Sequence, residues 1–268
     1  GVNGEEKAPI MVQSHAFGGA TDLPDALIDA AGFGEGIWLE NVGFLHLKRL
    51  RVTGNGSAGR PKEGEMRVGL LLSVAKGGHL HHVTIENIHI YGVFYEDPGF
   101  VRGKEEVRTE NGTQKYGWGI RLINQQDDGL IEEVLIRNCR VENVSHTGIK
   151  FTGKLHQNIR QVRLYHNQIA RTGGPGIQMS GVRGVHVMGN EVTHSGSTDD
   201  SRKWGRGSGL WTWAASVVLI EHNRFLYANG PGDSAGAHID YNCDNVVLQY
   251  NFSAHNAGGF CEILGNNY

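Results

Sequence analysis

Two acidic residues, Asp240 and Glu262, occupy the same place in two successive segments of similar pattern, Gly236–Asp240 and Gly258–Glu262. They are 22 residues apart, about one turn of a parallel β-solenoid. In such a fold they would stack on one sheet surface, roughly 4.8 Å apart at the backbone. Carboxylates at about 5–5.5 Å suit retaining cleavage of a glycosidic bond. We therefore predict Asp240 as the nucleophile and Glu262 as the acid/base.

Repulsion at this distance would make one of the two carboxyls hold its proton to a higher pH than the other. That split would provide one ionised carboxylate and one proton donor. Side chains splayed to about 6.5–9.5 Å would favour an inverting route instead. A Ca²⁺ site or a solvent-facing acidic patch is the alternative interpretation of the pair. For the hydrolytic reading we expect no metal and no other cofactor.

The side chains around this pair predict a sugar-binding surface. His238 lies two residues before Asp240 on the same predicted face, where it could bond a sugar hydroxyl. Trp211, Trp213 and Phe260 would be exposed beside it, and exposed aromatic rings on a rigid sheet can hold the apolar faces of sugars. The alternative is that long loops cover these rings.

Further candidates for binding lie along the same face and in two long insertions, residues 93–117 and 195–208. Long loops in compact folds are usually functional, and both insertions are expected at one edge of the sheet, where they could wall a groove. The candidates on the face are Lys150, which forms a basic stripe with Arg121, and Gln178; those in the second insertion are Asp199, Asp200, Arg202, Trp204 and Arg206.

Two strand patterns alternate along the chain and must position these residues. The glycine strands read Gly-apolar-x-apolar, and they begin at Gly36, Gly69, Gly119, Gly148, Gly176 and Gly209. The asparagine strands are β-branched runs that end in Asn87, Asn138, Asn167, Asn190, Asn223 and Asn251. We expect the six asparagines to sit at corners between strands and to stack as a ladder. The 40 glycines of the whole chain suit a fold with many tight corners.

Alignment of the glycine strands predicts two outward columns of side chains. The first runs through Trp38, Leu71, Arg121, Lys150, Gln178, Trp211, His238 and Phe260. The second runs through Glu40, Ser73, Ile123, Thr152, Ser180, Trp213, Asp240 and Glu262. An antiparallel sandwich of hairpins is the competing fold, but hairpins do not require the same Gly and Asn at the same phase in every unit.

With these repeats the chain resembles the right-handed parallel β-helix proteins, above all the carbohydrate-active enzymes. The stretch from Ala237 to Phe260 is similar to one in secreted bacterial polysaccharide-degrading members. The resemblance implies an all-β, single-stranded right-handed parallel β-helix with an Asn ladder and loop insertions, a secreted or periplasmic location, and an oligo- or polysaccharide substrate. The pectin hydrolase motifs are absent.

Bulk composition is consistent with one β-helix domain over residues 1–268. The net charge of −3 argues against a nucleic acid or an anionic membrane as a partner. The sequence contains no run of 18 apolar residues, so we expect no membrane span. Of the three cysteines, Cys139 and Cys261 sit at inward positions of the strands. Because Tyr268 follows the last strand with no capping element, we expect a fragment that lacks terminal coils or caps. The oligomeric state stays open.

The sequence is compatible with three functions. A glycoside hydrolase would use Asp240 and Glu262. A polysaccharide lyase would use His238, Lys150 or Arg121 as base or neutraliser, with Ca²⁺ at the acidic cluster. Lys150 and Arg121 lie three to four coils from the acids, roughly 14–19 Å at 4.8 Å per coil, which disfavours the lyase. The third hypothesis is a non-catalytic glycan-binding β-helix.

Overall fold

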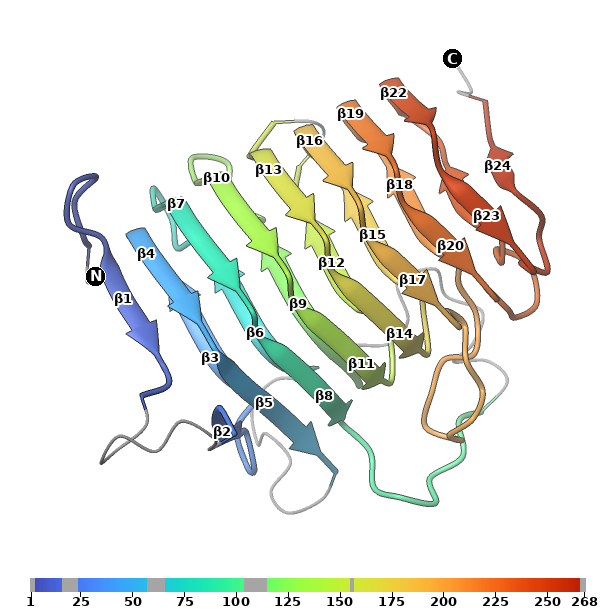
Figure 1. Cartoon of the computed structure of the whole chain (residues 1–268), viewed down its shortest axis with the longest axis horizontal. Helices are drawn as coiled ribbons and strands as arrows, with labels where there is room; N and C mark the ends of the chain where they lie inside the picture. The colour runs from blue at the N-terminus through green and yellow to red at the C-terminus, as the bar shows by residue number, and fades with distance from the viewer. Residues whose placement is uncertain (1–2, 16–23, 57–65, 104–114, 155–156, 266–268) are drawn as a thin grey trace.

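The protein is a parallel β-helix built from three eight-stranded sheets, as seen in a computed structural model that describes residues 3–15, 24–56, 66–103, 115–154 and 157–265. The chain visits the sheets in turn, and every ladder between coils is parallel. Figure 1 shows the coils stacked along one axis with the two termini at opposite ends. The predicted fold class is confirmed. The described residues contain no helix that could cross a bilayer.

The bounds of the strands follow the three sheets. The first sheet holds β1 (Ile10–Gln13), β4 (Gly43–Lys48), β7 (His79–Glu86), β10 (Leu130–Arg137), β13 (Ile159–Tyr165), β16 (Val182–Met188), β19 (Ser216–Glu221) and β22 (Asp244–Gln249). The second holds β2 (Ala26–Asp29), β5 (Leu50–Asn55), β8 (His89–Phe94), β11 (Arg140–Val144), β14 (Gln168–Thr172), β17 (Glu191–Thr193), β20 (Arg224–Leu226) and β23 (Phe252–Ala254). The third holds β3 (Glu35–Glu40), β6 (Met66–Ser73), β9 (Tyr116–Ile123), β12 (Ile149–Thr152), β15 (Ile177–Ser180), β18 (Leu210–Trp213), β21 (Ala237–Ile239) and β24 (Cys261–Ile263).

The glycines at the start of the third-sheet strands are needed for close approach rather than for tight corners. A Cβ on Gly176 would lie 2.8 Å from the carbonyl oxygen of Gly209 and 2.2 Å from Cγ1 of Val192. A Cβ on Gly148 would likewise lie 2.7 Å from the Gly176 oxygen. The backbone of each coil therefore packs against the next coil and against a second-sheet side chain with no room for a methyl group.

The asparagine ladder exists, but it has four members in place of six. The members are Asn167, Asn190, Asn223 and Asn251. The Oδ1 atom of each accepts a 2.9 Å hydrogen bond from the backbone amide at the same position one coil earlier, which for Asn167 is the amide of Cys139. Asn87 and Asn138 sit one residue earlier in the repeat, with left-handed φ of 52° and 53°. The buried Cys139 takes the ladder position in its coil and donates its thiol to the Ile85 carbonyl.

The described parts of the two insertions meet each other over the third sheet. Nε of Arg102 donates to the carbonyl of Arg202 at 2.7 Å, and Nη1 of Arg202 donates to Oδ1 of Asn55 at 2.8 Å. Figure 1 shows both loops, one after β8 and one after β17, on the same side of the solenoid. Residues 104–114 of the first insertion lie outside the described residues. The loops cover the sheet face here, where an open groove was expected.

Candidate functional site

The register at the last coil differs from the predicted one. Strand β21 pairs with β24 so that Ala237 faces Cys261 and His238 faces Glu262. The predicted alignment had placed Glu262 above Asp240. The difference arises because Gly258 and Gly259 belong to the corner before β24, where Gly259 has a φ of 88°. Glu262 thus completes the first column in place of Phe260.

The corrected register removes the stacked Asp240–Glu262 pair. The two residues are now offset by one strand and by two residues along it, which puts their backbones about 8 Å apart. That offset no longer supports a retaining pair at about 5–5.5 Å. The rest of the first column is confirmed, since Trp38, Leu71, Arg121, Lys150, Gln178, Trp211 and His238 pair in that order.

Most of the first column is buried rather than solvent-facing. Lys150 and Gln178 are almost wholly inaccessible, and only 8% of Trp211 is exposed. Trp204 of the second insertion is also buried, and it stacks on His146 with ring centroids 4.7 Å apart. Trp211 is therefore covered, as in the alternative interpretation of the aromatic surface, and Trp204, predicted as a subsite residue, is covered as well. Trp213 is half-buried, and Phe260 is 55% exposed but precedes strand β24.

Burial lowers the pKa values of the basic residues in the first column. Burial lowers the pKa of Lys150 well below its usual value, and the charge of Arg121 adds to that effect. Burial also lowers the pKa of Arg121, to about 10. The pKa of His146 falls well below its usual value, first through burial and then through the charges of Lys150, Arg102 and Arg121. A neutral His146 follows at neutral pH.

Asp240 is the most constrained carboxylate of the region. Its Oδ2 accepts a hydrogen bond of 2.9 Å from the indole nitrogen of Trp211, one coil earlier. Its Oδ1 accepts a hydrogen bond of 2.7 Å from the backbone amide of Tyr241. Only 7% of the residue is exposed, so two fixed donors orient both oxygens of a nearly buried carboxylate.

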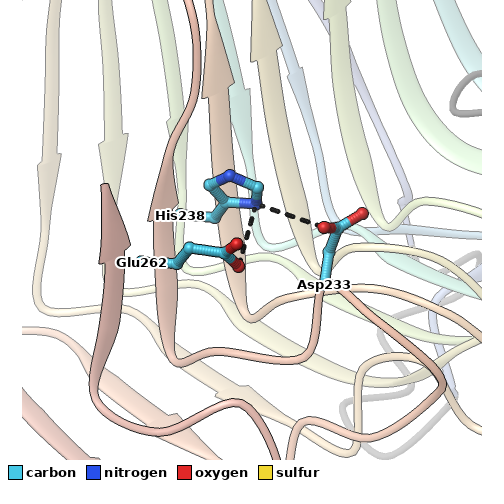
Figure 2. Close-up of side chains that lie close together, drawn as sticks. All are labelled: Asp233, His238 and Glu262. Carbon is cyan, nitrogen blue, oxygen red and sulfur yellow. Dashed lines mark ion pairs between the residues drawn. The ribbon is translucent and has the colours of Figure 1, made fainter. Parts of the chain in front are cut away.

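Beside Asp240, a second group of side chains gathers around His238 (Figure 2). Nδ1 of His238 lies 3.8 Å from Oδ1 of Asp233 and 3.7 Å from Oε2 of Glu262. The ligand atoms of all three side chains lie within 4.8 Å of one another. We call Asp233, His238 and Glu262 the histidine–carboxylate cluster. Asp240 follows His238 by two residues, so the last two described coils carry three carboxylates in this part of the chain.

Asp233 was missed from the sequence. It lies in a turn rich in glycine, directly before β21, and its other carboxylate oxygen accepts from the guanidinium of Arg206. Arg206, predicted as a subsite residue, therefore reaches the site through Asp233. The available signal was an acidic residue in the loop that leads into the strand of His238 and Asp240. Strand alignment does not evaluate loop residues, and so it could not find Asp233.

The other predicted subsite residues of the second insertion stabilise that loop. Asp199 bonds Lys203 and Arg171, and Asp200 bonds the guanidinium of Arg202. Lys203 and Arg202 are themselves buried. Asp240 bonds Trp211 and Glu262 lies beside His238, whereas the predicted stacking of Glu262 on Asp240 is wrong. Lys150 is buried one coil beyond Gln178, and Asp199 pairs with Arg171.

Comparisons with known proteins agree with this architecture. The family model described as right-handed beta helix region matches residues 75–267. A GH136 lacto-N-biosidase from Eubacterium ramulus superposes with a TM-score of 0.71 at 18% identity; the match covers 97% of this chain and 48% of that enzyme, so this chain spans about half its length. No curated protein sequence matches the chain significantly.

Two further solved structures share the fold. An alginate lyase from Paenibacillus sp. str. FPU-7 has a TM-score of 0.55 at 14% identity, with 99% of this chain and 86% of that chain covered. The enzymatically active domain of tailspike protein 2 from bacteriophage CBA120 has a TM-score of 0.53 at 11% identity, with 87% and 31% covered. At these identities the likeness extends to the fold alone.

Proposed function

The chain belongs to the right-handed β-helix family, and we propose that it acts as a glycoside hydrolase on an oligo- or polysaccharide. The observation that supports this function is the cluster of Asp233, His238 and Glu262, with Asp240 two residues after His238 in the chain. Glycoside hydrolysis needs two carboxyl groups that flank the scissile bond, one to donate a proton and one to attack or to activate water. Three carboxylates from adjacent coils supply that pair.

We assign Asp240 to the fixed role of nucleophile or base. Its two oxygens are already oriented by the Trp211 indole and the Tyr241 amide. An attacking carboxylate must present one oxygen to the sugar in a fixed direction. A group held in this way also keeps its geometry when the sugar arrives.

We assign the proton-donor role to the Asp233–Glu262 pair, with Glu262 as the first candidate. Asp233 is engaged by the guanidinium of Arg206, whereas Glu262 contacts neither Lys nor Arg among the described residues. The Glu262 side chain is 39% exposed and is therefore open to a leaving-group oxygen. His238 lies between the two acids, 3.8 Å from an oxygen of Asp233 and 3.7 Å from an oxygen of Glu262.

A polysaccharide lyase is the second candidate function, because the histidine–carboxylate cluster also offers oxygen ligands to a cation beside an imidazole base. Lys150 is not available as its base, since it is buried three coils from His238 in the ladder, roughly 14 Å away at 4.8 Å per coil. We also propose that the protein works outside the cytoplasm, which suits either activity.

The test is glycan cleavage by the chain and by Asp240→Asn, Glu262→Gln and Asp233→Asn. The panel contains neutral glycans, lacto-N-biosides and alginate, and the assay records new reducing ends together with ultraviolet absorbance of unsaturated products. We expect reducing ends without that absorbance, and losses of about 10³-fold or more for Asp240→Asn and one other variant. Ca²⁺-dependent absorbance would establish the lyase instead. No cleavage by a folded chain would refute both.

A further inference from the structure

His238 is buried, and its ring nitrogens have no hydrogen-bond partner in the part of the chain that the structure describes. Only 2% of the side chain is exposed, and neither Nδ1 nor Nε2 makes a hydrogen bond among the described residues. A buried polar atom in that state destabilises the folded protein unless something completes its bonding. Nδ1 points toward the carboxylates of Asp233 and Glu262, as Figure 2 shows.

The distances around Nδ1 suit an atom held between the three side chains. At 3.7 and 3.8 Å the nitrogen is too far from either carboxylate for a direct hydrogen bond, which ends near 3.2 Å. Ligand atoms that share one metal ion at bonds of about 2.0–2.4 Å lie roughly 3.3–4 Å from one another. The cluster, with all three atoms within 4.8 Å, needs only a small contraction to reach that geometry.

We propose that Asp233, His238 and Glu262 form a site for a divalent transition-metal ion of the Zn²⁺ type. One imidazole nitrogen and two carboxylate oxygens are ligands that such ions accept, whereas Ca²⁺ and Mg²⁺ prefer oxygen alone. Three protein ligands leave a position open for water or a sugar hydroxyl. The exposed sides of Asp233 and Glu262 give the ion a path from solvent.

Neighbouring groups already orient two of the three ligands. Arg206 bonds Oδ2 of Asp233, which leaves Oδ1 directed at the histidine. Glu262 is fixed beside His238 by the parallel pairing of β21 with β24. Such outer contacts typically account for 10- to 100-fold in metal affinity. The site is thus held in place by the two last coils and the turn that leads into β21.

A regulatory consequence rests on the proposed hydrolase. An ion on Glu262 and Asp233 withdraws the carboxyl that must give its proton to the leaving group. Metal occupancy therefore inhibits hydrolysis, and chelation restores it. Asp240 is not one of the proposed ligands. The metal ion therefore inhibits proton donation to the leaving group and does not act on Asp240.

The site is tested by isothermal titration of the EDTA-treated chain with ZnCl₂ and, separately, with CaCl₂. We expect one Zn²⁺ site with a dissociation constant of about 1 µM or lower, and Ca²⁺ at least 100-fold weaker. Asp233→Asn and Glu262→Gln should each weaken Zn²⁺ binding at least tenfold. His238→Gln should abolish the site, and the two half-exposed carboxylate variants keep the test valid if that buried change impairs folding.

His81→Ala is the matched control. It removes a histidine from the group formed by His79, His81 and His82 on β7, which could bind Zn²⁺ at the surface. Unchanged tight binding in this variant supports the proposed site. Unchanged tight binding in Asp233→Asn and Glu262→Gln overturns it, as does Ca²⁺ binding more tightly than Zn²⁺.

The inhibitory role is read separately, from cleavage of any glycan that the chain hydrolyses. Activity should fall at least tenfold when Zn²⁺ saturates the site, and EDTA should recover it. Full activity with the site saturated overturns the inhibition while the binding result stands. Absence of any hydrolysis refutes the proposed function and leaves the titration to decide the metal site by itself.

Discussion

The indole nitrogen of Trp211 donates a hydrogen bond of 2.9 Å to the carboxylate of Asp240 on the next coil. Only 7% of Asp240 is exposed. Trp211 therefore orients Asp240 through its indole N–H, and its buried ring does not offer a sugar-binding surface. Strand β18 places the tryptophan, and the loop end of β21 places the acid. The pair couples the orientation of the proposed nucleophile to the packing of the column.

Trp211→Phe keeps an aromatic ring and removes this donor. A hydrogen bond to a charged group contributes about 1.5–3 kcal/mol, so the free energy of unfolding should fall by about that amount. The value of kcat/KM on a cleaved glycan should fall at least tenfold, because Oδ2 of Asp240 loses its orientation. Urea denaturation and steady-state kinetics measure the two effects. Trp213→Phe, on the same strand, should leave both nearly unchanged, and equal effects in the two variants would contradict the assignment.

Asn190→Ala should be among the most damaging changes in the ladder. The side chain of Asn190 accepts from the backbone and amide nitrogens of Asn167 and donates to the Leu164 carbonyl at 2.8 Å. Alanine leaves these buried groups without partners, which costs about 2–5 kcal/mol for a network of this size. Urea denaturation should show that loss. The exposed Asn229→Ala is the control, and an equally small change in both would argue against the ladder as a source of stability.

Asp199 should make the second insertion sensitive to acid. Burial raises the pKa of Asp199, but hydrogen bonds from Lys203 and Ser197 and the charges of Lys203 and Arg171 outweigh it and lower the pKa to about 2. A lowered pKa in the folded state gives stability that is present above the unfolded value near 4. That stability is lost as the pH falls from about 4 to 2.

The measurement is the melting temperature of the chain and of Asp199→Asn from pH 7 to pH 2. The variant should melt below the parent at pH 7, and the difference should vanish near pH 2. Asp127→Asn, which removes a carboxylate that is 92% exposed and pairs with Lys154, should show a smaller difference. A gap between parent and Asp199→Asn that persists at pH 2 would show that the effect does not come from the charge.

Gly176→Ala should disrupt the stack of coils. The new methyl group would lie 2.8 Å from the Gly209 carbonyl oxygen and 2.2 Å from Val192, and backbone cannot move without breaking the ladder. Overpacking of this kind costs about 1–3 kcal/mol or more. Circular dichroism and urea denaturation would report it. Gly103→Ala introduces its methyl group into open space and should be neutral; a neutral Gly176→Ala would show that the coils can separate.

The sequence by itself determined the coil pattern. Strict alternation and the recurring Gly-apolar-x-apolar phase identified the parallel β-helix and the first column from Trp38 to His238, because each coil repeats one set of contacts. It also placed Asp240 and Glu262 in adjacent coils. These features depend on local chemistry that every coil repeats.

Only the tertiary structure decided the register of the last strand and the contacts that the loops make, because these depend on the lengths of corners and on the paths of the loops. Two corner residues, Gly258 and Gly259, shift Glu262 from Asp240 to His238, and alternation cannot detect a shift by two because it keeps the same face. The burial of Trp211 and Lys150 and the approach of Asp233 to His238 follow from loops that fold back over the sheet. Such contacts join residues without any fixed spacing, so no periodic pattern in the chain encodes them.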